Sequence, residues 1–175
     1  MELIRVYTQQ DLYFEEGISL CFDAFPRAER RDREELLRVL KNPDYHFEVL
    51  VEEGRFLGIM LYWQTPDFLY LEHFSTLPSL RGQGLGCKAL TLLKEKGHTI
   101  VLEIEPPSDD LTRRRSGFYQ RNGFVPTSHV HIQPKYHVND PDLQLQILSH
   151  PYGIGAEEYE RFYKYLKKEV QNPLA

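Results

Sequence analysis

The sequence predicts an α+β protein with a central mixed, mostly antiparallel sheet flanked by helices. The first observation behind this prediction is the order of the elements, in which hairpins alternate with two helical crossovers. The second is the composition, since 41% of the 175 residues are hydrophobic and 27% are charged, as in globular proteins that form a core without disulfides. We expect one domain over residues 1–150 and a helical extension over 151–175, packed on the same domain.

The first half of the chain is predicted to form four strands and three helices. Residues 2–7 alternate as in a strand, and Thr8 with Asp11 resembles a capping box. The helix that follows is expected to bury one stripe of side chains, formed by Phe14, Ile18, Cys21, Phe22 and Phe25. The remaining elements are a short helix over 32–41, two strands over 46–52 and 55–64, a strand over 68–76, and a helix over 84–96 with Gly97 after it.

In the second half of the chain, strands and helices continue to alternate. The expected elements are a strand over 99–105, a helix over 111–122, strands over 124–132 and 143–148, and a final helix over 157–170. Residues 133–141 read as a loop. The final helix carries an aromatic face that must be buried, either on the sheet or in a homodimer contact.

Charge, cysteines and hydropathy narrow the function classes. The net charge of −5 argues against nucleic acid as a partner. The two cysteines, Cys21 and Cys87, suit neither a disulfide framework nor a zinc site, so we expect no metal. The first residues do not resemble a signal peptide and no apolar run could cross a membrane, which predicts a cytoplasmic protein without membrane contact.

The most informative segment is Arg81-Gly82-Gln83-Gly84-Leu85-Gly86, which leaves a strand and opens a helix. Glycines there allow a tight turn, and backbone N–H groups at a helix start can hold an anion such as a phosphate. The spacing does not match the dinucleotide or Walker patterns. Arg81, Gly84 and Gly86 match the pattern R-x-x-G-x-G; the alternative is a purely structural turn between the strand and the helix.

Two motifs together resemble the GCN5-related N-acetyltransferases (GNAT). The first is the glycine-rich segment, and the second is Gly117-Phe118-Tyr119-Gln120-Arg121-Asn122-Gly123-Phe124, which looks like the family's FY-x-x-x-GF segment. The resemblance covers residues 3 to 148 and implies a splayed sheet. Where many members have an Asn contact to the cofactor, this chain has Thr112, and Arg113–Arg115 could reach a CoA phosphate instead or form a solvated face.

The resemblance implies acetyl-CoA as co-substrate. Backbone groups of Phe74, Ser75 and Thr76 are expected to bind the pantetheine, which slots between the fourth and fifth strands like an added strand. Backbone N–H groups from Gly82 to Gly86 are expected to hold the pyrophosphate. Tyr119 aligns with the family's tyrosine that protonates the departing thiolate; the alternative is a core aromatic residue.

The predicted general base is Glu72, because a carboxylate in a partly apolar strand has a raised pKa. His73 is expected on the opposite face if that strand is regular. Glu103 and Glu105 are rival bases or an anionic lining for a cationic substrate. Transfer through an acetylated Cys87 is a less favoured route, and packing is its ordinary role.

The sequence thus predicts an N-acetyltransferase that moves an acetyl group from acetyl-CoA directly to a primary amine of a small molecule or a peptide. The alternative is a non-catalytic acyl-CoA binding or sensing module on the same fold. The loop over 133–139 is expected near the acceptor. A different acyl donor and a homodimer both remain open at this point.

Overall fold

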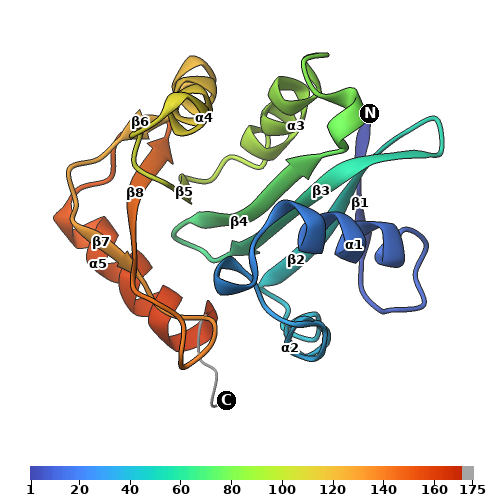
Figure 1. The fold of residues 1–175 in the computed structure, drawn as a ribbon, viewed down its shortest axis with the longest axis horizontal. Helices are drawn as coiled ribbons and strands as arrows, with labels where there is room; N and C mark the ends of the chain where they lie inside the picture. The colour runs from blue at the N-terminus through green and yellow to red at the C-terminus, as the bar shows by residue number, and fades with distance from the viewer. Residues whose placement is uncertain (171–175) are drawn as a thin grey trace. The chain divides into compact units, whose positions relative to one another are not determined.

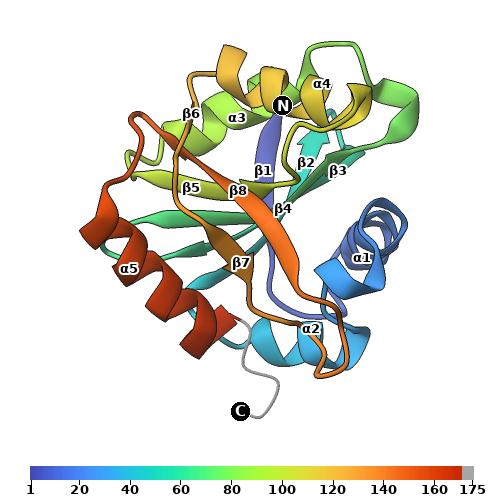
Figure 2. The same cartoon turned by 60° about the vertical axis from the view of Figure 1, so that its left-hand side comes forward.

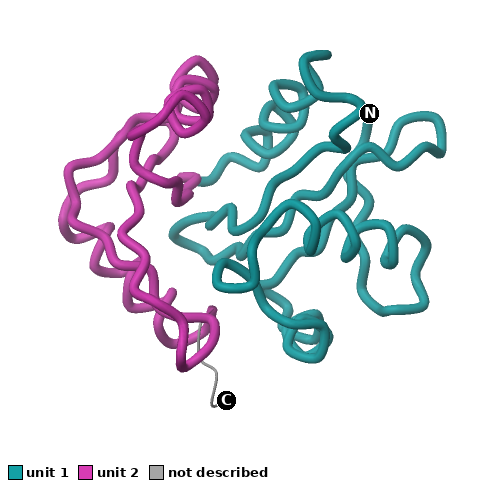
Figure 3. Tube along the Cα trace, in the orientation of Figure 1, with its two compact units in different colours: residues 1–98 teal, residues 99–175 magenta. Residues whose placement is uncertain are grey.

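The computed structural model describes residues 1–170. The chain divides into two compact units, residues 1–98 and the part from residue 99 onward (Figure 3).

Unit 1 holds an antiparallel sheet of four strands in the order β1-β2-β3-β4 (Figure 1). The strands are β1 (Glu2–Val6), β2 (Tyr45–Glu52), β3 (Arg55–Gln64) and β4 (Leu69–Thr76). Its helices are α1 (Phe14–Ala24), α2 (Arg33–Val39) and α3 (Leu85–Lys94), with 3-10 turns at Arg27–Glu29 and Pro78–Leu80. Every strand and helix predicted for this part of the chain is confirmed.

The two faces of the unit 1 sheet are covered by different helices. Gly17 of α1 approaches the side chains of Phe47 and Val49 so closely that a Cβ there would lie 2.8 Å from the Phe47 ring. Glu48 points to the other face, where it meets Lys96 just beyond α3 at 3.5 Å. The alternation of side chains along β2 therefore separates the α1 face from the α3 face.

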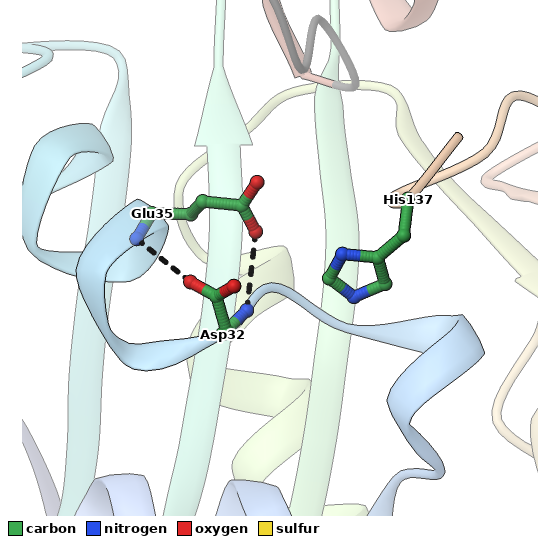
Figure 4. A group of neighbouring side chains, drawn as sticks. All are labelled: Asp32, Glu35 and His137. Carbon is green, nitrogen blue, oxygen red and sulfur yellow. Dashed lines mark hydrogen bonds between the residues drawn. The ribbon is translucent and has the colours of Figure 1, made fainter. Parts of the chain in front are cut away.

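The predicted capping box at Thr8 and Asp11 is wrong. The Asp11 carboxylate accepts the backbone N–H groups of Tyr7 (2.7 Å) and Thr8 (3.1 Å), so it closes a turn before the helix. α1 begins only at Phe14, after Tyr13 in a left-handed conformation. A capping box does open α2, where Asp32 and Glu35 exchange bonds of 3.2 Å between side chain and backbone (Figure 4).

Unit 2 is built around one long strand, β8 (Leu143–His150), which pairs antiparallel with β5 (Ile100–Ile104), β6 (Val125–Pro126) and β7 (His131–Gln133). Its helices are α4 (Asp110–Arg121) and α5 (Ala156–Tyr165), and α5 continues as a π turn over Leu166–Val170. The single strand predicted over 124–132 is wrong, because β6 ends at Pro126, the Thr127 N–H makes one more bond to the Ile147 carbonyl at 2.9 Å, and strand pairing with β8 resumes only at His131.

Helix α5 lies along β7 and β8 (Figure 2). Its apolar side is buried, through Phe162, Leu166 and Val170. The hydroxyl of Tyr163 donates to the Ile132 carbonyl at 3.2 Å. The aromatic face predicted for the final helix therefore packs on β7 of the same unit, where the rings of Tyr159, Phe162 and Tyr163 contact His131.

The predicted α+β class, with mostly antiparallel strands flanked by helices, is confirmed. No helix among residues 1–170 is both long and apolar enough to span a membrane.

Candidate active site

The glycine-rich loop joins the end of β4 to the start of α3 in unit 1. Gly82 and Gly84 have φ angles of 79° and 76°, in the left-handed region that glycine adopts without strain. A Cβ at either position would meet no atom of the described residues within 4 Å. The backbone conformation, and not crowding, therefore requires glycine, and the space over the loop is open.

The first turn of α3 can receive an anion. Within the described part of the chain no side chain caps this turn, and the first N–H groups of a helix have no partner inside the helix. Leu85 is buried and anchors the helix start, whereas Arg81 and Gln83 are exposed beside it. Backbone N–H groups, the helix dipole and the Arg81 charge together suit a phosphate.

The end of β4 leads directly into this loop. Phe74, Ser75 and Thr76 are half-buried and pair with residues 58–60 of β3. Gly58 permits an unusually close approach, since a Cβ there would lie 2.5 Å from the Ser75 carbonyl oxygen and 2.9 Å from the Thr76 Cα. The strand end predicted to bind pantetheine and the loop predicted to bind the pyrophosphate are thus consecutive in one unit.

Glu72 lies at a β-bulge. In the β3–β4 ladder Leu61 pairs with His73 and Tyr62 pairs with Leu71, which leaves Glu72 as the additional residue on β4. The bulge breaks the alternation on which the prediction for His73 depended. His73 Nδ1 lies 3.9 Å from Glu72 Oε2, so the expectation that the two side chains point to opposite faces is wrong.

The Glu72 carboxylate is fully buried and has strong partners. Arg31 Nη1 lies 2.6 Å from one carboxylate oxygen, and the Trp63 indole N–H donates to the other at 3.1 Å. The Arg31 guanidinium lies over the rings of Trp63 (5.5 Å) and Tyr45 (5.8 Å). Burial, and then the Glu72 charge, raise the pKa of Tyr45 well above its usual range.

The sequence analysis did not identify Arg31. A signal was available, because a carboxylate inside an apolar strand requires a buried cation or several donors. The sequence does not reveal which arginine is the buried cation, because Arg31 and Glu72 are 41 positions apart.

Tyr119 lies on α4 in unit 2. Its ring packs edge-on against Phe118 (5.2 Å) and Phe124 (5.6 Å). Burial raises the pKa of Tyr119 to about 12. The phenol therefore keeps its proton at neutral pH and is able to donate it. Its role as the acid stays a prediction.

Glu103 and Glu105 have different surroundings. Glu105 is half exposed and pairs with Arg115 at 2.5 Å. Glu103 is buried; its Oε1 bonds to His131 Nε2, and its Oε2 accepts from Gln133 Nε2 at 2.9 Å. The sequence analysis missed His131 and Gln133 as partners, because the short strand that carries them was predicted with the wrong boundaries.

The other predicted groups are distributed over both units. Arg113 pairs with Asp110 at 3.3 Å, and Arg114 is exposed on α4. Thr112 forms the capping box of α4 together with Asp109. This structural role accounts for a threonine at position 112 without a contact to the cofactor. Cys87 is an exposed thiol on the first turn of α3.

Comparisons with known proteins agree with this arrangement. A family model described as an acetyltransferase (GNAT) domain matches residues 43–126. YjbC of Bacillus subtilis (strain 168), which is named as an acetyltransferase, is 33% identical over 152 residues, covering 85% of this chain and 76% of that protein.

Solved structures agree as well. A GNAT-family structure from Bacteroides thetaiotaomicron superposes with a TM-score of 0.92 and 29% identity over 100% of both chains. An aminoglycoside 6'-N-acetyltransferase complexed with coenzyme A has a TM-score of 0.65 at 14% identity, covering 89% of this chain and 99% of that chain, and shares the fold. From the sequence relative, the family model and the matching fold together, the chain belongs to the GNAT family of acetyltransferases.

Proposed function

We propose that this acetyltransferase moves the acetyl group of acetyl-CoA directly to a primary amine of a small molecule or a peptide. The observation that carries the proposal is the loop over residues 81–86, whose left-handed glycines leave open space over the uncapped start of α3. Gly82 to Gly86, with Arg81, hold the pyrophosphate through backbone N–H groups and charge. Phe74, Ser75 and Thr76 supply backbone groups for the pantetheine.

Tyr119 is the proposed general acid. Acetyl transfer from a thioester releases a thiolate, which leaves more readily when a proton is supplied. The pKa of Tyr119, raised to about 12 by burial, keeps the phenol protonated at every pH at which the enzyme is expected to work.

The proposed base is one of the three carboxylates that the sequence offers, Glu72, Glu103 and Glu105. Their contacts in the structure differ and favour one of them. Glu72 is bonded to the Arg31 guanidinium and the Trp63 indole, with His73 Nδ1 at 3.9 Å. Because the guanidinium keeps its charge near neutral pH, this ion pair lowers the basicity of Glu72 and is suited to hold the strand in place. Glu105 is half exposed and paired with Arg115. Glu103 is bonded to an imidazole and to a neutral amide, those of His131 and Gln133. We therefore favour Glu103 over Glu72 as the group that takes the amine proton.

The first experiment is a thermal-shift measurement with acetyl-CoA, and with NADH and ATP as control anions. A ligand at 100 times its Kd adds about 2.7 kcal/mol to the free energy of unfolding, which raises Tm by about 5 °C at this chain length. A shift with acetyl-CoA alone supports the site. No shift at saturation would contradict the proposal.

A panel of primary amines, with release of the CoA thiol as the readout, then tests catalysis. Glu103→Gln is expected to lower kcat/KM by about 100-fold or more while the acetyl-CoA thermal shift is retained. Glu72→Gln and Glu105→Gln are the matched variants. If Glu72→Gln alone abolishes turnover in folded protein, Glu72 is the base as the sequence predicted. Binding of acetyl-CoA with no thiol release from any amine would favour the sensing module. A cytoplasmic location and a homodimer stay predictions.

A further inference from the structure

Helix α4 ends in a tight turn that begins at Tyr119. The backbone N–H of Gly123 donates to the Gln120 carbonyl at 2.9 Å, and that of Phe124 donates to the Tyr119 carbonyl at 3.1 Å. Gly123 itself has a left-handed φ of 81°. The two bonds and this conformation define a Schellman motif, in which the chain beyond the helix bonds back to its third-last residue. Tyr119, the proposed general acid, is therefore part of the turn that closes its own helix.

The same turn brings two aromatic rings into contact. The Phe124 ring meets the Tyr119 ring edge-on, with 5.6 Å between the centroids, and Phe124 is 2% exposed. An apolar contact between these two positions commonly accompanies a Schellman motif. The direction of the Tyr119 ring, and with it the position of the hydroxyl, thus depends on where the turn holds Phe124.

His150, the last residue of β8, contacts this turn from outside the helix. Its Nδ1 lies 2.9 Å from the Gly123 carbonyl oxygen, and because a carbonyl oxygen only accepts, Nδ1 carries the hydrogen of this bond. The imidazole also packs against the Phe124 ring, with 5.4 Å between the centroids. A Cβ at position 123 would lie only 3.4 Å from Nδ1. His150 therefore holds both residues that follow the end of α4.

Strand β8 supplies a firm base for this contact. His150 lies opposite Ile100 of β5 in the antiparallel ladder. The preceding residue, Ser149, lies opposite Val125 of β6, which comes directly after Phe124. The turn is thus attached to β8 twice, through the backbone pairing of β6 and through the imidazole of His150.

We propose that His150 is a positioning residue for acetyl transfer. By holding the turn after α4, it keeps the Tyr119 ring at the angle at which the hydroxyl can protonate the departing thiolate. The proposal rests on the proposed function, in which Tyr119 is the acid. A general acid acts only within hydrogen-bond reach of the atom that it protonates, and a misplacement of about 1 Å can cost about 100-fold in rate.

The first test measures the turn by NMR in the full chain, in the wild type, in His150→Leu and in His129→Leu. His129→Leu is the matched control, because His129 is half-buried in the same unit and bonds to a backbone carbonyl, that of Ile154, at 3.1 Å. His150→Leu is expected to shift the Tyr119 ring resonances. It is also expected to speed amide exchange at Phe124 about fivefold, the effect of one lost hydrogen bond on local opening. His129→Leu is expected to change neither.

A further variant, His150→Asn, separates the lost bond from a general effect of substitution. Its side-chain N–H can donate from nearly the same place as Nδ1, so the exchange at Phe124 is expected to return toward the wild-type rate. Equal exchange in His150→Leu and His129→Leu would overturn the proposal, and so would Tyr119 ring resonances that do not move. Because these measurements require no turnover, they test the link from His150 to Tyr119 separately from the proposed function.

The second test is a double-mutant cycle on kcat with His150→Leu and Tyr119→Phe. His150→Leu alone is expected to lower kcat about tenfold with the Kd for acetyl-CoA unchanged, and His129→Leu is expected to keep the wild-type kcat. If His150 acts through the Tyr119 hydroxyl, its loss has no further effect once that hydroxyl is gone. The double variant is therefore expected to turn over as fast as Tyr119→Phe.

The cycle distinguishes two failures. A double variant about tenfold slower than Tyr119→Phe would show that His150 does not act through Tyr119, which overturns this proposal and leaves the proposed function intact. A Tyr119→Phe variant as fast as the wild type would instead remove Tyr119 as the acid, and the proposal for His150 would fall with it.

Discussion

The guanidinium of Arg31 lies 2.6 Å from the carboxylate of Glu72, and both side chains are almost completely buried, at 6% and 0% exposure. The pair links the stretch before α2 to the bulge of β4. A buried ion pair of this kind contributes little net free energy, but loss of one partner leaves an uncompensated charge. We therefore regard Arg31 as the residue that fixes the bulge by holding Glu72.

Arg31→Met is expected to lower the free energy of unfolding by about 3–5 kcal/mol, because it leaves the Glu72 carboxylate buried without its cation. Chemical denaturation measures this loss. The double variant Arg31→Met, Glu72→Gln is expected to recover part of it, since neither charge is then buried alone.

The matched control for this pair is the exposed pair of Arg33 and Glu15, whose two bonds are 3.0 and 2.5 Å long. Glu15→Gln is expected to cost less than about 1 kcal/mol, because solvent screens exposed pairs. If Arg31→Met costs no more than Glu15→Gln, the pair does not hold the bulge.

Gly84→Ala is expected to weaken acetyl-CoA binding by about tenfold and to lower the free energy of unfolding by about 1 kcal/mol. A side chain at φ 76° is expected to strain the loop and to move its N–H groups away from the proposed position of the phosphate. The Kd, measured by calorimetry, and the Tm report the two effects.

Gly97→Ala is the matched control, since Gly97 follows α3 with φ 75° and equally open surroundings. It is expected to lower stability by a similar amount without loss of affinity for acetyl-CoA. Equal affinities of the two variants would contradict the loop as the binding site.

Local patterns predicted most of the fold. The alternation along β2 and β3 and the glycines that bound α3 depend only on neighbouring residues, and these elements were found. The capping box at Thr8 was wrong because the Asp11 N–H donates to the Thr8 carbonyl and not to its hydroxyl. The helix begins only at Phe14, which a four-residue pattern does not reveal.

The candidate site was predicted less completely, because its side chains are joined over long stretches of chain. The glycine loop is a local motif and was identified. The partners of Glu72 and Glu103 lie 41 and 28 positions away in the sequence, and the bulge that turns Glu72 toward Arg31 depends on the pairing with β3. Only the folded structure supplies these relationships.

Tyr119→Phe is expected to lower kcat by about 100-fold without a change in the Kd for acetyl-CoA, because it removes the hydroxyl proton and leaves the ring in place. Tyr152→Phe is the control, since Tyr152 is an exposed tyrosine of the same unit. Equal rates for the two variants would remove Tyr119 from the mechanism.

The raised pKa of Tyr119 also predicts the stability of the protein in alkali. Because burial raises this pKa from 10.0 to about 12, the neutral phenol is favoured in the folded state. Its contribution to stability is present below about pH 10 and is lost as the pH rises through about 12. The difference in Tm between wild type and Tyr119→Phe should therefore change over that interval. A constant difference would show that the phenol is not buried in solution.

Gly58→Ala tests whether the end of β4 must approach β3 as closely as the structure shows. The new methyl group would lie 2.5 Å from the Ser75 carbonyl oxygen and 2.9 Å from the Thr76 Cα, and backbone atoms cannot swing aside as a flexible side chain can. Overpacking of this kind costs about 1–3 kcal/mol, and the strand end must shift to relieve it. Because Phe74, Ser75 and Thr76 are the proposed pantetheine contacts, the folded variant is expected to bind acetyl-CoA about tenfold more weakly.

Gly17→Ala is the control, since its methyl group would meet the Phe47 ring at 2.8 Å and strain the core on the α1 face. This variant should lose stability but retain its affinity for acetyl-CoA. If the two variants lose affinity equally, general destabilisation and not the position of the β4 end accounts for the loss.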